Sequence, residues 1–306
     1  MKISKTLLGL CLSCLVLSSF AEQTAYQRGL DFLLKNQSPK GSWGSPHNTK
    51  GLNIYVPGIA AHHTYKVGCS ALVLWALARD KNQDAKVKKA FHKGLNYLIK
   101  ESQRLKRARA DWIGNNWSHV YTIRAFLAAL DNQKIDNQQR AAMKGLIQDQ
   151  INSLCKFRNT DGGWGYYDLD HKLRRPGGQS TSFTTASVLI ALKKAQNAGY
   201  TIPEKHLKKA IKNLQIQRKP DHSFVYSFGW RTAPMHTVNR PAGSLARSQS
   251  GNLALHLWKD PKTNSTVLKS WVDKLIKRNG WLDIARKRNQ PHEGWFQTSG
   301  YYYYYG

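Results

Sequence analysis

Polar side chains, with tyrosine, histidine, asparagine and arginine among them, gather at residues 62–65, 115–121, 179–182 and 236–247, and each segment precedes an apolar run. These residue types suit an elimination reaction on an acidic sugar. Arginine would hold the carboxylate of the sugar. Asparagine would make the neighbouring carbon easier to deprotonate, and tyrosine or histidine would transfer the proton. His119 and Tyr121 are the candidates for proton transfer in such a lyase.

The same segments also suit ligand binding without catalysis. The candidate binding residues are His62, His63, Asn116, Trp117, His119, His236, Asn239, Arg240 and Arg247. A structural interpretation competes with both, because Asn, Ser and Thr are favoured at helix N-caps. Ser180, Thr181 and Ser244 stand where such caps would be needed. The residue types alone therefore leave catalysis, binding and capping open.

Sequence motifs for metal or phosphate chemistry are missing from the chain. It contains no Gly-rich phosphate loop, nucleophile elbow or His-Glu-x-x-His. His62 and His63 are adjacent in a segment predicted to be extended, where successive side chains point to opposite sides. We therefore predict no metal site and no cofactor.

Two kinds of helix alternate along the chain, with a spacing of about sixty residues between like units. One kind is amphipathic and rich in lysine, and it is predicted at residues 26–36, 86–98, 139–157, 204–217 and 266–278. The other kind is apolar nearly all round and is predicted at residues 69–78, 121–130, 184–192 and 251–258. A helix without a polar, solvent-exposed face must be covered by other elements on both sides. The alternation therefore predicts two concentric layers of helices.

Gly-Trp loops follow several of the amphipathic helices. The clearest are Gln-Ser-Pro-Lys-Gly-Ser-Trp-Gly at 37–44 and Asn-Thr-Asp-Gly-Gly-Trp-Gly at 159–165, with weaker copies at 217–224, 279–281 and 293–295. Gly and Asn end helices by accepting the left-handed conformation. The pattern Gln-x-x-x-Gly-x-Trp-Gly resembles the QW repeat of squalene and oxidosqualene cyclases, whose fold is shared by protein prenyltransferase β-subunits. The resemblance covers most of residues 24–300.

The resemblance implies an all-α fold: an α/α toroid of inner and outer helix hairpins, forming one domain over residues 22–306. In such a toroid the four polar segments would meet at one mouth of the central cavity. The sequence supplies four inner and five outer helices, fewer than the family's ring contains. Five tyrosines at 301–305 stand where another inner helix would start, so the toroid is either open or incomplete at its C-terminal end.

The catalytic motifs of that family are degraded or absent here. Class II terpenoid cyclases protonate an alkene with an Asp-x-Asp-Asp motif, and the nearest match is Asp-Leu-Asp-His at 168–171. Asp170 would be the acid only if the chain is a cyclase, and a protonated His171 would weaken it by stabilising its carboxylate. Cys69 and Cys155 do not form the zinc pattern of prenyltransferases, and Cys69 lacks the downstream Gln of a thioester. Both cysteines are expected to be buried free thiols.

The N-terminus has the pattern of a cleavable signal peptide. Basic residues at positions 2 and 5 precede an apolar stretch at 7–16, and the small residues Ser19 and Ala21 follow it. We predict cleavage after Ala21, which would leave residues 22–306 as a periplasmic or secreted protein. No second long apolar run follows, so the mature chain is not expected to cross a membrane.

The chain carries 47 basic and 18 acidic residues, a formal net charge of +29. Charge of this size concerns partners and solubility rather than fold. Nucleic acid is not expected as a partner of an exported protein, so an anionic polysaccharide or other acidic polymer is predicted, along with a lipid in the central cavity as an alternative. The sequence thus predicts a non-catalytic toroid that binds a ligand or anionic partner at its mouth. The alternatives are a lyase or other enzyme on an anionic glycan, and an atypical class II terpenoid cyclase.

Overall fold

The computed structural model describes residues 24–44, 59–80, 84–105, 115–131, 135–165, 177–235, 239 and 244–278. Over these residues the prediction of an all-α chain is confirmed: helices and two isolated β-bridges are present, and no strand. No helix in this part is long and apolar enough to cross a membrane. The predicted signal peptide, Asp170, His236, Arg240 and the tyrosines at 301–305 lie outside the described residues. The chain divides into two compact units, residues 1–37 and 38–306.

The described part of the first unit is the amphipathic helix α2 (Ala25–Lys35). Thr24 and Gln27 form a capping box at its start, because the Gln27 N–H donates to Thr24 Oγ1 and the Thr24 N–H donates to Gln27 Oε1, both at 3.2 Å. At the other end, the Asn36 side chain donates to the Phe32 carbonyl oxygen at 2.7 Å. These bounds match the helix predicted at 26–36.

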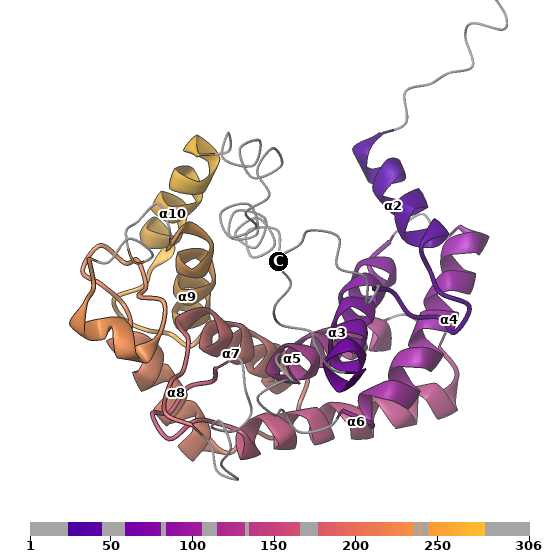
Figure 1. Cartoon of the computed structure of the whole chain (residues 1–306), viewed down its shortest axis with the longest axis horizontal. Helices are drawn as coiled ribbons and strands as arrows, with labels where there is room; N and C mark the ends of the chain where they lie inside the picture. Colours follow the sequence, from indigo (N-terminus) through magenta and orange to yellow (C-terminus); the bar gives the residue numbers. More distant parts are fainter. Residues whose placement is uncertain are drawn as a thin grey trace, which may run out of the picture. The chain divides into compact units, whose positions relative to one another are not determined.

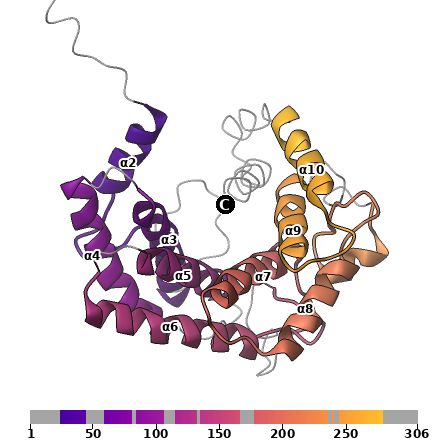
Figure 2. The same ribbon diagram turned by 180° about the vertical axis from the view of Figure 1, so that it is seen from behind.

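The described residues of the second unit form eight α-helices and the 3-10 helix η1 (Phe228–Thr232). The α-helices are α3 (Ile59–Ala78), α4 (Ala85–Ser102), α5 (Asn115–Leu130), α6 (Asn137–Lys156), α7 (Ser182–Asn197), α8 (Glu204–Ile216), α9 (Leu245–Leu257) and α10 (Ser265–Lys277). Helices α3, α5, α7 and α9 form one row in which each packs on the next (Figure 1). Helices α4, α6, α8 and α10 each pack on the row helix that precedes them, and α4, α6 and α8 lie along one side of the row (Figure 2).

Burial in the second unit follows the two kinds of helix that the sequence distinguishes. In α4 the buried residues include Val87, Phe91, Leu95 and Leu98, the apolar positions of its amphipathic pattern, while its lysines are exposed or half-buried. In α7 most residues are buried, including Ser182, Thr184 and Thr185. Helices α5, α7 and α9 are therefore covered over most of their surface, polar residues included, whereas α3 keeps an exposed face.

The row helices begin earlier than their apolar runs. Helix α3 starts ten residues before the predicted 69–78 segment, and α5 starts six residues before 121. The prediction that His62 and His63 lie in an extended segment is wrong, because both belong to α3. Polar and small residues such as Asn116 and Ser118 fill these first turns, where their side chains are buried and hydrogen-bonded to neighbouring elements.

The capping interpretation is only partly supported. Thr181 and Ser244 occupy the N-cap positions of α7 and α9, but neither side chain makes the capping hydrogen bond. The Thr181 hydroxyl donates instead to Thr184 Oγ1 at 2.7 Å. Ser180 lies before the cap and its hydroxyl bonds to Asn213 Oδ1 of α8 at 3.2 Å. Ser180 therefore joins two elements of the fold, whereas the Thr181 hydroxyl bonds within the start of α7.

Three loops of the second unit share one hydrogen-bonded turn. The N–H of the first residue donates to the carbonyl four positions later, from Ser38 to Ser42 (2.8 Å), from Asn159 to Gly163 (2.8 Å) and from Lys219 to Ser223 (2.7 Å). The residue before that carbonyl has positive φ in each copy: Gly41 at 94°, Gly162 at 101° and His222 at 62°. A Cβ on Gly162 would lie 2.8 Å from the Lys209 carbonyl oxygen of α8, so the turn needs glycine there both for its φ and for its contact.

A buried aromatic residue follows each of these turns: Trp43, Trp164 and Phe224. The backbone N–H of Trp43 donates to Ser70 Oγ of α3 at 2.9 Å, and that of Trp164 donates to Thr185 Oγ1 of α7 at 3.0 Å. Each hydroxyl bonds back to the carbonyl of the same tryptophan, at 3.3 Å in both cases. The Gly-Trp loops therefore attach to equivalent positions on two row helices.

Cys69 and Cys155 are both free, but only one matches the expected burial. Cys155 on α6 is buried, whereas Cys69 on α3 is exposed. Cys69 lies one helical turn after Tyr65, which is also exposed, so this face of α3 is not covered by the described residues.

Candidate functional site

Four aromatic side chains from three segments of the second unit contact one another in a row. Trp117 and Tyr121 of α5 stack with ring centroids 5.7 Å apart, and Trp117 stacks on Phe183 of α7 at 6.1 Å. Phe183 then meets Tyr226 edge to face at 5.3 Å. All four side chains are half-buried. We call these residues the aromatic row; its rings are partly accessible, and Trp117, Tyr121 and Tyr226 also carry a polar group.

Arg247 lies at the Tyr226 end of the aromatic row. Its Cζ is 5.5 Å from the centre of the Tyr226 ring, a cation–π distance. Its Nε donates to the Phe224 carbonyl oxygen at 2.9 Å, and the residue is buried on α9. Arg247 therefore supports the segment that carries Tyr226 and adds positive charge beside its ring.

Asn239 and Ser182 fix the position of Tyr226. The Tyr226 N–H donates to Asn239 Oδ1 at 2.7 Å, and the Asn239 amide donates to the Ala233 carbonyl oxygen at 3.0 Å. The Ser182 N–H donates to the Tyr226 carbonyl oxygen at 3.2 Å. Asn239, predicted as a binding residue, is buried and thus positions an aromatic ring.

Asn116 joins the start of α5 to the second Gly-Trp loop. Its amide nitrogen donates to the Gly165 carbonyl oxygen at 2.8 Å, and the side chain is buried. One residue later, Trp117 turns into the aromatic row. Of these two predicted binding residues, Asn116 therefore fixes the position of α5, and Trp117 presents an aromatic ring.

His119 lies between α5 and α6, apart from the aromatic row of its own helix. Its Nδ1 hydrogen-bonds to Gln150 Oε1 of α6, and the side chain is buried. Burial lowers the pKa of His119 from 6.5 to about 4, while the hydrogen bond with Gln150 opposes the shift. The imidazole is therefore neutral near neutral pH.

The buried imidazole should make stability depend on pH. The unfolded chain binds a proton near pH 6.5, whereas the folded chain binds it only near pH 4. The free energy of unfolding should therefore fall by about 2 kcal/mol between about pH 7 and about pH 5. Urea unfolding at the two pH values measures this fall. His119→Gln should remove that part of the pH dependence, and an unchanged dependence in the variant would contradict the assignment.

His63 is used in a contact between α3 and α4. Its Nε2 lies 3.0 Å from Glu101 Oε2, and Glu101 also contacts Arg104 at 3.5 Å. The side chain of His62 lies outside the described residues. Within the described residues no group of three or more His, Cys, Asp or Glu side chains is placed to hold a metal ion.

Two arginine side chains lie over the Trp75 ring of α3, and Lys194 lies within reach of their charge; we call Arg79, Arg124 and Lys194 the basic cluster. The Cζ atoms of Arg79 and Arg124 lie 5.2 and 4.7 Å from the centre of the Trp75 ring. The pKa of Lys194 on α7 is lowered, first by burial and then by the positive charges of Arg124 and Arg79. Arg124 follows Tyr121 by three residues on α5, so both lie on one helix face. The helices of the aromatic row therefore also carry concentrated positive charge.

Sequence reasoning identified Trp117, Tyr121 and Arg247 but missed Phe183, Tyr226 and the basic cluster. Trp117 and Phe183 each stand in the first turn of a row helix. An aromatic residue recurring at that position is the signal that could have identified Phe183. Tyr226 comes from a loop, and nothing in the sequence around it marks its contact with Phe183.

Comparison of the chain with protein-family models, with curated proteins and with solved structures found no match.

Proposed function

We propose that this chain is an exported α/α toroid of the squalene cyclase and prenyltransferase repeat type that binds an anionic polysaccharide without turning it over. The toroid is supported by the row of α3, α5, α7 and α9, by the helices that pack along it, and by the three like turns. The binding site is the aromatic row, and Arg247 and the basic cluster supply the positive charge.

The row of ring contacts from Tyr121 through Trp117 and Phe183 to Tyr226 is the observation that carries this proposal. Ligand sites combine apolar and aromatic walls with a few placed polar or charged groups. Half-buried aromatic rings can contact the apolar face of a sugar ring with the surface that they leave accessible. The guanidinium of Arg79, which is exposed, suits a carboxylate or sulfate group on the same polymer, because its fork of donors matches two oxygens. Arg124 and Arg247 are buried and contribute through their charge.

A purely binding role is supported by the surroundings of His119. A lyase would need a side chain that can exchange a proton with the sugar. His119 is buried and hydrogen-bonded to Gln150 on α6, so its ring serves the contact between two helices. The lyase interpretation then depends on Tyr121 alone among the predicted catalytic residues of the described part.

The experiment is a binding titration of the purified protein against a panel of acidic polysaccharides, at low and at high salt. We expect saturable binding that weakens as salt screens the charges, with no growth of ultraviolet absorbance from unsaturated products. Growth of that absorbance would replace the binding role with the lyase alternative. Absence of saturable binding to every acidic polysaccharide would contradict the proposal.

Trp117 occupies the centre of the aromatic row, where it contacts both Tyr121 and Phe183. Trp117→Ala should weaken polysaccharide binding by about tenfold or more, because it removes a stacking face and two aromatic contacts. Trp258→Ala is the matched control, since Trp258 is also half-buried but lies at the end of α9 and bonds to the Leu189 carbonyl oxygen. Equal losses of affinity in the two variants would contradict a role for the row.

A further inference from the structure

A pocket of about 250 Å³ lies between the C-terminal part of α8 and the loop that joins α9 to α10. Its polar and charged walls come from Lys212, Gln215, Arg218, Asp260 and Lys262. Ile216 and Pro261 add two apolar surfaces. The helices and loop that form this pocket contribute no residue to the aromatic row.

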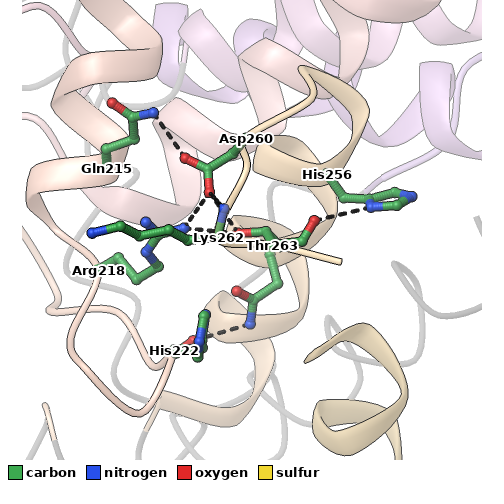
Figure 3. Close-up of polar contacts among 8 residues, drawn as sticks. Gln215, Arg218, His222, His256, Asp260, Lys262 and Thr263 are labelled. Carbon is green, nitrogen blue, oxygen red and sulfur yellow. Dashed lines mark hydrogen bonds and ion pairs between the residues drawn. The ribbon is translucent and has the colours of Figure 1, made fainter. Parts of the chain in front are cut away.

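The arginine and the carboxylate of this pocket hold each other in place (Figure 3). Arg218 Nη1 donates to Asp260 Oδ1 and to Thr263 Oγ1, each at 2.7 Å. Gln215 Nε2 donates to Asp260 Oδ2 at 2.8 Å. The side chains of Arg218 and Asp260 are only 9% and 2% exposed. This wall of the pocket is therefore rigid before any ligand arrives.

The loop that carries Lys262 is fixed by the same carboxylate (Figure 3). The Lys262 N–H donates to Asp260 Oδ1 at 3.0 Å, and the Thr263 hydroxyl donates to it at 3.1 Å. His256 Nδ1 donates to the Thr263 carbonyl oxygen at 3.1 Å, which ties the loop to α9. The backbone of Lys262 therefore has a defined position, and only its side chain needs to be ordered by a ligand.

The charges around this pocket do not balance. Asp260 is compensated by its ion pair with Arg218, which leaves the charges of Lys212 and Lys262. Neither lysine takes part in an ion pair within the part of the chain that the structure describes. The Arg218 guanidinium also uses only Nη1 for its two side-chain hydrogen bonds. The pocket thus offers excess positive charge and further donors on a rigid frame.

We propose that this pocket binds a tetrahedral oxyanion, the phosphate or sulfate group of an organic ester. Lys212 of α8 and Lys262 of the loop supply point charges, and the guanidinium of Arg218 supplies donors. The volume exceeds that of the oxyanion group alone, and Ile216 and Pro261 provide contact for the carbon group that carries it. The proposal is independent of polysaccharide binding at the aromatic row.

Titration calorimetry of the protein with inorganic phosphate and with inorganic sulfate tests this proposal. We expect saturable binding, and we expect Lys212→Ala and Lys262→Ala each to weaken it by about tenfold, because each removes a charge-assisted hydrogen bond. Lys277→Ala is the control, since Lys277 is exposed on α10 and does not line the pocket. Both pocket lysines are exposed, so their loss should leave folding intact.

Two further experiments complete the test. One distinguishes a polymer-borne anion from a small ester, and the other distinguishes this proposal from polysaccharide binding at the aromatic row. Competition of a sulfated polysaccharide with phosphate would identify polymer-borne sulfate as the ligand, whereas phosphate binding without competition would identify a small phosphate ester. Trp117→Ala should leave phosphate binding unchanged, so failure at the aromatic row would not affect this result. Absence of saturable phosphate and sulfate binding, or equal losses in Lys262→Ala and Lys277→Ala, would overturn the proposal.

Discussion

Trp164→Ala should lower the free energy of unfolding by about 3–5 kcal/mol, the cost of emptying a large, fully buried aromatic site. Trp164 has no exposed surface, and its Nε1 donates to the Leu154 carbonyl oxygen of α6 at 2.8 Å. Its backbone N–H donates to Thr185 Oγ1 of α7. One side chain thus joins a loop to two helices, and alanine would leave both a cavity and an unpaired carbonyl oxygen. Urea unfolding followed by circular dichroism measures the change.

Trp258→Ala provides the comparison for this prediction. Trp258 also donates its Nε1 to a backbone carbonyl, that of Leu189 at 3.0 Å, but its ring is half-buried. Its replacement should therefore cost clearly less than that of Trp164. A loss below about 1 kcal/mol in Trp164→Ala, less than the cost typical of a much smaller core deletion, would show that the Gly-Trp loop does not hold these helices together.

Asp260→Ala should be about as destabilising, by about 3–5 kcal/mol, because it leaves a mostly buried guanidinium without its partner. The carboxylate accepts hydrogen bonds from Arg218, Gln215 and Thr263 and from the backbone of its own loop (Figure 3). The double variant Arg218→Met with Asp260→Ala should recover part of the loss, since it no longer buries an unpaired charge. A loss of stability in the double variant equal to the sum of the losses in Arg218→Met and Asp260→Ala would contradict this pairing.

The exposed pair Lys269–Asp273 is the matched control for Asp260. Its Nζ–Oδ2 distance of 2.8 Å is close to that of the Arg218–Asp260 pair, but its side chains are 76% and 58% exposed. Asp273→Ala should therefore change the free energy of unfolding by about 0–1 kcal/mol. Because the two ion pairs have similar N–O distances, the difference between the two variants measures the effect of burial on the free energy of unfolding.

The contribution of Asp260 should also depend on pH in a defined direction. Burial acts to raise its pKa, but hydrogen bonds from Arg218, Gln215 and Thr263 and the charge of Arg218 outweigh burial, so the pKa lies below 3.8. The stabilisation is then fully present above the pKa of the unfolded chain and is lost as the pH falls through the lower folded value. The unfolding curves of the protein and of Asp260→Asn should converge in acid.

The periodicity of apolar residues was enough to identify the α-helices of the described part, but not the starts of row helices such as α3 and α5. In α4, Val87, Phe91 and Leu95 recur at helical spacing, and the structure buries them. The first turn of α5 carries Asn116 and Ser118, which lack that signal. Their burial depends on the Gly165 and Thr64 carbonyl oxygens, far away in the sequence. Such partners are defined only once the helices have packed.

The candidate site was predictable in its residue types and not in its geometry. Trp117 was found because it lies in a polar segment before an apolar run. The aromatic row needs Phe183 and Tyr226, which come from separate segments and meet only because Ser182 and Asn239 hold the Tyr226 backbone. His119 shows the opposite case, since its residue type suits catalysis while its packing against α6 gives it a structural hydrogen bond.

Footprinting with hydroxyl radicals tests the central claim most directly, because it reports which side chains a bound polysaccharide covers. The protein would be oxidised with and without a saturating acidic polysaccharide, and each aromatic residue would be followed by mass spectrometry. We predict protection of Trp117, Tyr121, Phe183 and Tyr226, with Trp258 unchanged. Binding without protection of these four side chains would contradict the claim.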